Sequence, residues 1–294
     1  MDQILQQLIN GLSLGSIYAL IALGYTMVYG IIQLINFAHG DVYMFGAYAG
    51  YVCMTHLHLD FFISLVVAMT ACAVLGVIIE RVAYKPLRNS TRIAVLITAI
   101  GVSLLLEYTM MYFAGAAVRT YPPLPGFMSG SYNIGGVTIT ALQLIIITVS
   151  VVLMLALQYV VKRTRLGKAM RAVSQDRDAA RLMGISVDNT ISFTFALGSA
   201  LAGAAGVLVG VYYNSINPLM GILPGLKAFV AAVLGGIGLI PGALIGGYLI
   251  GTTEVVVSGL GFSTYRDAAV FAILIIVLIV KPSGLLGKNV REKV

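Results

Sequence analysis

Residues 36–41, with the sequence NFAHGD, put an amide, an imidazole and a carboxylate between two long apolar runs. An ionisable side chain at bilayer depth costs about 2.5–3.5 kcal/mol on insertion scales, so such residues usually face a polar cavity or a partner. Asn36 and Gly40 are also poor residues for the interior of a helix. We therefore expect a helix break here, followed by a half-helix, within residues 36–45.

The polar groups of this break have two interpretations. A broken helix exposes backbone N–H and C=O groups, which a membrane tolerates only inside protein or beside a water-filled cavity. In the first interpretation the break lines a path through the membrane, with Asn36 and His39 as polar contacts and Phe37 as an apolar wall. In the second, His39 and Asp41 bond each other or backbone groups and only hold the break in place. The candidate path residues are Asn36, Phe37, Ala38, His39, Gly40 and Asp41, together with Gly235 and Gly236 from a second interrupted segment.

The composition places these residues in an all-α polytopic membrane protein. The chain is 59% hydrophobic and 10% charged, and several charge-free stretches exceed the roughly 20 apolar residues that cross a bilayer. The second interrupted segment contains Gly235-Gly236 and Pro241-Gly242, which break a helix. Counting how often the chain must cross the membrane predicts about eight or nine transmembrane helices, some of them broken or re-entrant. They form a single domain over residues 1–294.

The basic residues indicate the orientation in the membrane. Fifteen of the 18 Lys and Arg residues fall in three clusters, near 81–92, 162–181 and 281–293. Such clustering is typical of cytoplasmic loops under the positive-inside rule. It predicts an N-terminus outside and a C-terminus in the cytoplasm, and it explains the net charge of +7 without a nucleic-acid partner. Neither the cysteines nor the histidines have the spacing of a metal site, and we expect no metal.

The longest basic stretch, residues 162–189, has the composition of ordered structure. Good helix formers fill residues 168–183, and Gly184 is a natural helix stop. Such a helix could lie on anionic lipid or dock a cytoplasmic partner, and composition alone favours neither. The chain has no complete G-x-x-x-x-G-K-[ST] motif for phosphate binding. Any ATP-driven work therefore needs a separate ATPase, which fits the docking interpretation.

Three motifs carry a resemblance to a known family. The stretches YTMVYGIIQLINFAHGDVYMFGAY, RAVSQDRDAARLMGISVDNTISFTFALGSALAGAAGVL and KAFVAAVLGGIGLIPGALIGGYLIG resemble the permease subunits of bacterial ABC importers for branched-chain amino acids. In length the chain looks like the shorter of the two paralogous permeases of such systems. The resemblance covers nearly the whole chain and implies an ABC importer permease fold, in the bacterial inner membrane, with no catalytic residues of its own.

The resemblance also implies a set of partners. These are a paralogous permease in a heterodimer, two ATP-binding subunits that hold ATP and Mg²⁺, and a periplasmic or lipid-anchored binding protein that delivers Leu, Ile or Val. A free amino acid carries two opposite charges and an apolar side chain, so its path needs N–H donors, acceptors and an apolar wall. Urea or short-chain amides remain an alternative substrate class, and a stand-alone carrier or channel remains an alternative mechanism. The residues similar to the ATPase-contacting loop are Arg177, Asp178, Ala179, Ala180, Leu182, Met183 and Gly184.

Overall fold

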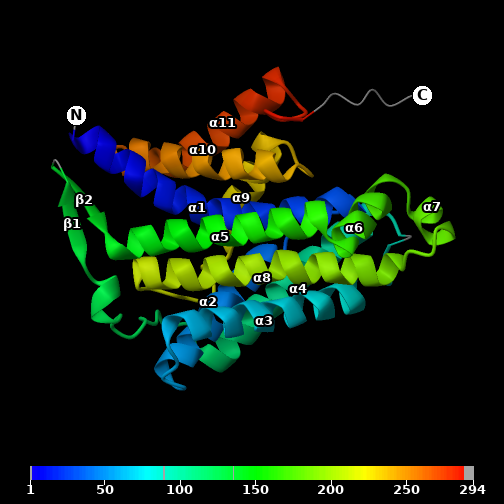
Figure 1. The fold of residues 1–294 in the computed structure, drawn as a ribbon, viewed down its shortest axis with the longest axis horizontal. Helices are drawn as coiled ribbons and strands as arrows, with labels where there is room; N and C mark the ends of the chain where they lie inside the picture. Colours follow the sequence, from blue (N-terminus) through cyan, green and yellow to red (C-terminus); the bar gives the residue numbers. More distant parts are fainter. Residues whose placement is uncertain (1, 89, 135, 288–294) are drawn as a thin grey trace.

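The computed structural model describes residues 2–88, 90–134 and 136–287 as an elongated helical bundle (Figure 1). Lys288, Arg291 and Lys293 of the third basic cluster lie outside the described residues. The elements are α1 (Asp2–Ile32), α2 (His39–Thr55), α3 (Phe61–Ile79) with a π-helical turn (Glu80–Tyr84), α4 (Arg92–Ala114), β1 (Ser131–Ile134), β2 (Val137–Thr140), α5 (Ala141–Arg163), α6 (Arg165–Gln175), α7 (Arg177–Leu182), α8 (Val187–Tyr213), α9 (Ile222–Gly235), α10 (Ile240–Gly259) and α11 (Arg266–Val280), with short 3₁₀ turns at Gly126–Met128 and Ser263–Tyr265.

The helix lengths confirm the predicted fold class. Within the described part of the chain, seven helices are long and apolar enough to cross a membrane. Two shorter helices, α2 and α9, sit in the two regions where the sequence predicts interrupted segments. At a rise of about 1.5 Å per residue, the 14 residues of α9 fall short of a ~30 Å hydrocarbon core. The bundle therefore contains both complete spans and shorter helices.

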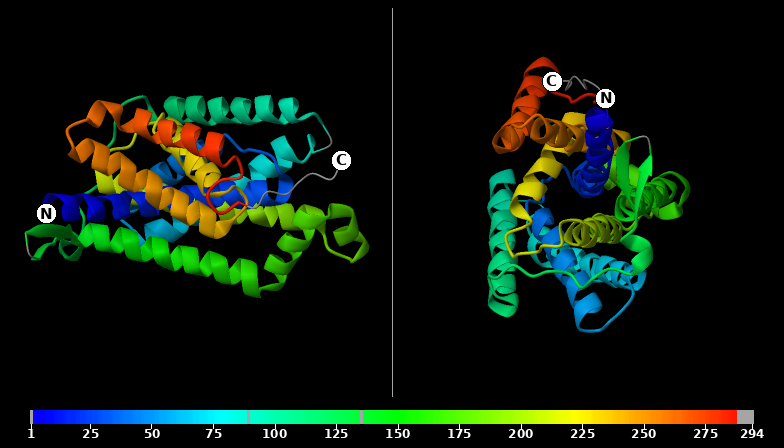
Figure 2. Two further views of the ribbon diagram at one scale, coloured as in Figure 1. Left: turned by 90° about the horizontal axis from the view of Figure 1, so that it is seen from above. Right: turned by 90° about the vertical axis from the view of Figure 1, so that its left-hand side faces the viewer.

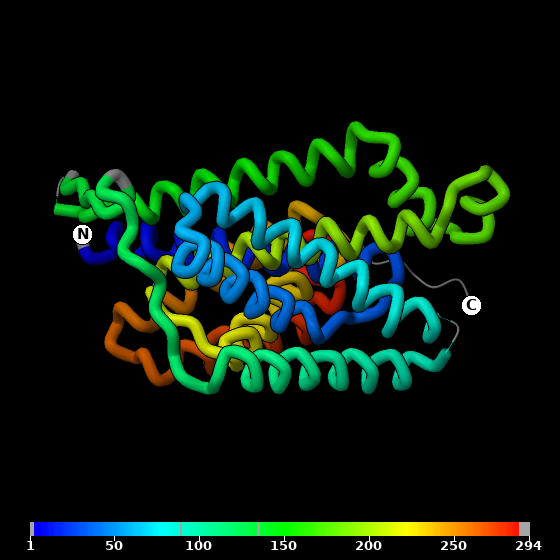
Figure 3. Tube along the Cα trace, turned by 90° about the horizontal axis from the view of Figure 1, so that it is seen from below, coloured from blue at the N-terminus to red at the C-terminus, as the bar shows by residue number. Residues whose placement is uncertain are grey.

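The helices are arranged around a buried centre. Most of α1 and α8 is buried, whereas α4, α5 and α11 are largely exposed. Figure 3 shows α4 along one edge of the molecule and α5 along the opposite edge. The exposed faces of these helices are apolar, as with Ile97, Leu105 and Leu155. Apolar surface of this extent suits contact with lipid chains or with other membrane subunits.

Glycines allow the central helices to approach closely. A Cβ atom on Gly15 of α1 would lie 2.9 Å from the Cα of Tyr248, and one on Gly251 of α10 would lie 2.4 Å from the Cα of Gly15. Likewise, a Cβ on Gly46 of α2 would lie 2.4 Å from the Cα of Gly203 in α8. Glycines spaced four apart along one helix face are typical of tight helix contacts in lipid. Here they serve packing within the chain.

Different elements lie at the two ends of the bundle. The N-terminal end of α1 and the β1–β2 hairpin lie at one end, joined by two hydrogen bonds between Gln6 and Thr138 at 2.8 and 2.9 Å. Helices α6 and α7 lie at the other end (Figures 1 and 2). At that end, Lys85 and Arg88 of the first basic cluster form ion pairs with Asp188 at the start of α8, which begins five residues after α7 ends.

Candidate functional site

The helix break predicted at NFAHGD is present. Helix α1 ends at Ile32, and the chain is non-helical through Ala38 before α2 begins at His39. Gln33 starts the break in a left-handed conformation with φ 55°, which a non-glycine residue adopts rarely and only where its surroundings hold it. The break turns the chain back, so that α2 runs into the centre of the bundle against α8.

Asn36 fixes the break to a neighbouring element. Its side chain is 3% exposed, and its Oδ1 accepts a hydrogen bond of 2.9 Å from the Tyr84 hydroxyl. Tyr84 closes the π-helical turn after α3. Asn36 therefore joins the break to α3.

His39 turns toward α1. A Cβ on Gly24 would lie 2.2 Å from its Nε2, and its ring meets Tyr25 edge-on with centroids 4.7 Å apart. Nε2 is buried and has no hydrogen-bond partner among the described residues. Asp41 instead accepts a hydrogen bond from Ser103 of α4, so the two side chains of the motif point to different neighbours.

A pocket with a volume of 430 Å³ lies beside the break, between α1, α2, α4 and α9. Phe37, Gly40 and Asp41 line it, whereas Asn36, Ala38 and His39 do not. Tyr25 of α1 and Ser103 and Glu107 of α4 supply its other polar side chains, and Glu107 is 7% exposed. Its apolar wall is formed by Leu96, Ile100, Leu104, Ile222 and Leu226.

The α4 side of this pocket is absent from the sequence-based prediction. Ser103 and Glu107 are four residues apart, so they share one helix face, and that spacing is a signal the sequence offers. Sequence alone does not place that face against Asp41. A pocket with two carboxyl groups, two hydroxyl-bearing side chains and an aliphatic wall can accept a small ligand with a cationic head and an apolar tail.

Gly235 and Gly236 make a sharp corner instead of lining this pocket. Helix α9 ends at Gly235, and Gly236 has φ 108°, a conformation that favours glycine. A Cβ on Gly235 would lie 1.8 Å from the backbone oxygen of Gly242 in α10. The two glycines therefore allow α9 to fold back directly onto α10.

The basic stretch of residues 162–189 contains two helices in its middle, α6 and α7, and the expected single helix over 168–183 is wrong. Asp176 separates α6 from α7 with extended backbone (φ −154°, ψ 116°), and its carboxylate accepts hydrogen bonds from the backbone of Asp178 and Ala179. Asp176 is therefore the N-cap of α7: its carboxylate accepts the first backbone N–H groups of that helix, and a new helix starts there. Gly184, with φ +80°, ends the element as predicted.

Helix α7 projects from the bundle (Figures 1 and 3) and carries two exposed apolar side chains. Leu182 is 90% and Met183 82% exposed, far more than large apolar residues in water normally are. Ala180 is buried on the opposite side, and Arg177 donates a hydrogen bond of 3.0 Å to the backbone oxygen of Ile32 in α1. Partial burial lowers the pKa of Arg177, and the nearby Arg88 and Arg181 add to this.

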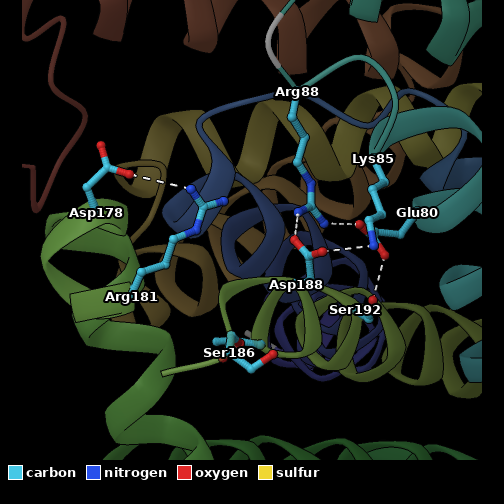
Figure 4. Close-up of polar contacts among 9 residues, drawn as sticks. Glu80, Lys85, Arg88, Asp178, Arg181, Ser186, Asp188 and Ser192 are labelled. Atoms are coloured by element: carbon cyan, nitrogen blue, oxygen red, sulfur yellow. Dashed lines mark hydrogen bonds and ion pairs between the residues drawn. The ribbon is translucent and has the colours of Figure 1, made fainter. Parts of the chain in front are cut away.

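An ion cluster lies at the base of this projection (Figure 4). Glu80, in the π-helical turn, is fully buried; it pairs with Arg88 and accepts a 2.6 Å hydrogen bond from Ser192 of α8. Arg88 and Lys85 both pair with Asp188, at 2.5 and 2.8 Å. The cluster thus joins the end of α3 to the start of α8, directly after the projecting element.

The comparisons with known proteins agree over nearly the whole chain. The family described as branched-chain amino acid transport system / permease component matches residues 7–279. The chain belongs to this family. It is 46% identical to the high-affinity branched-chain amino acid transport system permease protein BraD of Pseudomonas aeruginosa, over 99% of this chain and 98% of that protein.

Two further permeases and one solved structure are also similar to this chain. The corresponding permease protein LivH of Escherichia coli is 45% identical, over 99% of this chain and 97% of LivH. The ribose import permease protein RbsC of Escherichia coli is 28% identical over 94% of this chain and 85% of RbsC. A structure of PsaBC from Streptococcus pneumoniae in complex with Fab aligns with 96% of this chain and 93% of that chain, at a TM-score of 0.50 and 13% identity, which shows a shared fold. BraD, LivH and RbsC are named as permeases, in agreement with the transport role expected from the sequence.

Proposed function

We propose that this chain is the membrane permease of an ATP-driven importer for branched-chain amino acids. The observation that carries the proposal is its 45–46% identity, over 99% of its length, to permeases named for branched-chain amino acid transport. Residues 1–294 act as one transmembrane domain in the bacterial inner membrane. ATP and Mg²⁺ are held by two partner ATPase subunits, a paralogous permease completes a heterodimer, and a binding protein delivers the substrate from outside.

The projecting helix α7 supports the ATPase part of this proposal. Leu182 and Met183 present an apolar tip, flanked by the exposed ion pair of Asp178 with Arg181 at 3.5 Å. An apolar centre with a charged rim is typical of protein–protein contacts. Arg177 and the buried Ala180 hold this element against the bundle, Ala179 lies on its exposed side, and Gly184 forms the turn that ends it. The whole stretch 177–184 is the coupling element, inside the cytoplasmic loop 162–189.

The orientation follows from the charge distribution. The end that carries α6 and α7 also carries the first two basic clusters, so it is the cytoplasmic end under the positive-inside rule. The N-terminus and the β1–β2 hairpin are then outside, where a binding protein delivers its load. The pocket beside the break, with Asp41 and Phe37, lies along the path between the two faces.

The test is ATP-dependent uptake of leucine by the reconstituted complex. The permease is co-expressed with its ATPases and paralogous permease, placed in proteoliposomes and supplied with the binding protein. We expect Leu182→Ser to reduce uptake and recovery of the ATPases together. The matched control is Leu57→Ser, because Leu57 is 60% exposed in the turn before α3 and should leave both unchanged. Concentrative uptake by the permease without ATPases would refute the proposal.

A further inference from the structure

A second pocket, with a volume of 410 Å³, lies beside Val209 and Tyr213 at the C-terminal end of α8, whereas α7 precedes the other end of that helix. Six helices border it: α1, α2, α8, α9, α10 and α11. It is separate from the pocket beside the break, with which it shares no lining residue. Its aliphatic wall consists of Leu14, Ile17, Val209, Met220 and Leu223.

Charged side chains of both signs meet at this pocket. The ammonium group of Lys227 lies 2.9 Å from Oε1 of Glu254 and 2.6 Å from Oδ1 of Asp267. Arg266 Nε lies 3.6 Å from both of these carboxylates. The side chains of Lys227 and Glu254 are 4% and 6% exposed, whereas Arg266 is 49% exposed. The set has two positive and two negative charges. Arg266 reaches solvent, as does Asp267, which is 35% exposed and pairs with Lys227 from outside the pocket lining.

A hydrogen-bonding group in the same pocket has no partner. The hydroxyl of Tyr43 in α2 is buried and makes no hydrogen bond within the described residues, and the Tyr43 side chain is fully buried. Leaving a buried polar group unpaired is costly. Tyr18 and Tyr213 line the same pocket.

Packing alone does not account for this arrangement. Buried ion pairs seldom stabilise a fold more than apolar side chains of the same size, and ionisable groups inside a membrane protein usually serve a pathway. Glu254 is already held by Lys227 and by a 2.7 Å hydrogen bond from Tyr18. The unpaired Tyr43 hydroxyl adds a donor that no described residue of the pocket uses.

We infer that this pocket binds a free amino acid with an aliphatic side chain, as a site that the substrate occupies on its way from the outer end. The ligand carboxylate accepts hydrogen bonds from Lys227 and Tyr43, and its ammonium group donates to Glu254. The aliphatic side chain packs on the wall around Ile17 and Leu223. A pocket with balanced charges suits a zwitterion, because neither ligand charge is left unpaired. This inference rests on the proposed function and names the place where its substrate binds.

The first test is binding of radiolabelled leucine to the purified importer complex in nanodiscs, without the binding protein. We expect saturable binding by the unmodified complex, and Tyr43→Phe should weaken it about 5- to 10-fold, the value of one hydrogen bond. The matched control is Tyr48→Phe: Tyr48 lies on the same helix and its hydroxyl is also buried without a partner among the described residues, but it does not line this pocket. It should bind leucine as the unmodified complex does.

The second test separates the two ligand charges. Unlabelled leucine should compete fully with the label, whereas N-acetyl-leucine, which lacks the ammonium group, should compete poorly. With Glu254→Gln, leucine should lose at least about tenfold in affinity and the preference over N-acetyl-leucine should shrink. Thermal unfolding of each variant complex reports its folding independently, and Tyr43→Phe should unfold no earlier than the unmodified complex.

These measurements keep the pocket and the proposed function apart. If the unmodified complex shows no ATP-dependent uptake of leucine with its binding protein, the proposed function fails. If it transports leucine but shows no saturable binding alone, or if Tyr43→Phe and Glu254→Gln bind and transport as well as Tyr48→Phe, the pocket inference is overturned. In that case the charged cluster serves only to pack α9, α10 and α11.

Discussion

Removing the Arg88 side chain should destabilise this protein far more than removing its neighbour Lys85. Arg88→Met leaves the carboxylate of Glu80, which is fully buried, without its positive partner. Opposite charges about 4 Å apart, at an effective dielectric constant of about 20, attract by about 4 kcal/mol. Breaking a buried pair costs about 3–5 kcal/mol. We therefore expect the free energy of unfolding to fall by about 3 kcal/mol.

Lys85→Met is the matched comparison. Lys85 pairs with Asp188, but both side chains are nearly half exposed, at 49% and 43%. Such pairs contribute about 0–1 kcal/mol. Asp188 also keeps its pairing with Arg88 in this variant, so the loss of stability should stay below about 1 kcal/mol.

A double variant tests the cause. Arg88→Met combined with Glu80→Gln removes the unpaired charge, while the amide oxygen introduced by the second change can still accept the hydrogen bond from Ser192. This pair of changes should recover most of the stability lost in Arg88→Met alone. The assay is unfolding of the purified protein in mixed micelles, with the midpoint and slope fitted for each variant. Equal losses for Arg88→Met and Lys85→Met, or no recovery in the double variant, would refute this account of the cluster.

Three further changes test the packing and the projecting element. Gly46→Ala should lower the free energy of unfolding by about 1–3 kcal/mol, because its Cβ would meet the backbone of Gly203 at 2.4 Å. Its control is Gly101→Ala in α4, where a Cβ would meet open space, and this change should not lower the free energy of unfolding. Asp176→Ala should cost about 1 kcal/mol through the lost cap of α7 and should lower ATPase recovery without changing the membrane bundle, as hydrogen exchange can show. Gly184→Ala should likewise reduce ATPase recovery, since its φ of +80° strains any residue with a Cβ atom; full recovery would contradict the role of this turn.

The sequence predicted the features that depend on local chemistry and on the membrane as solvent. Long apolar runs must be helical in a bilayer because every backbone group needs a partner, so the fold class followed from composition. The break was predicted from Asn36 and Gly40; the structure has it at residues 33–38, and Gly40 is already helical in α2. The stop after α7 was predicted from Gly184. The break between α6 and α7 was missed because the N-cap role of Asp176 was overlooked, although Asp is a favoured N-cap residue.

Only the tertiary structure decided which side chains meet. Asn36, His39 and Asp41 are neighbours in sequence, yet the structure directs them to Tyr84, Gly24 and Ser103. Glu80 and Asp188, or Lys227 and Glu254, become partners only because helices far apart in the chain pack side by side. The helical repeat of the sequence shows which residues share one face of a helix. Which faces contact each other depends on where glycines let two helices approach closely and on which charged residues pair across the bundle. Such contacts join residues far apart in the chain, so no single stretch of sequence predicts them.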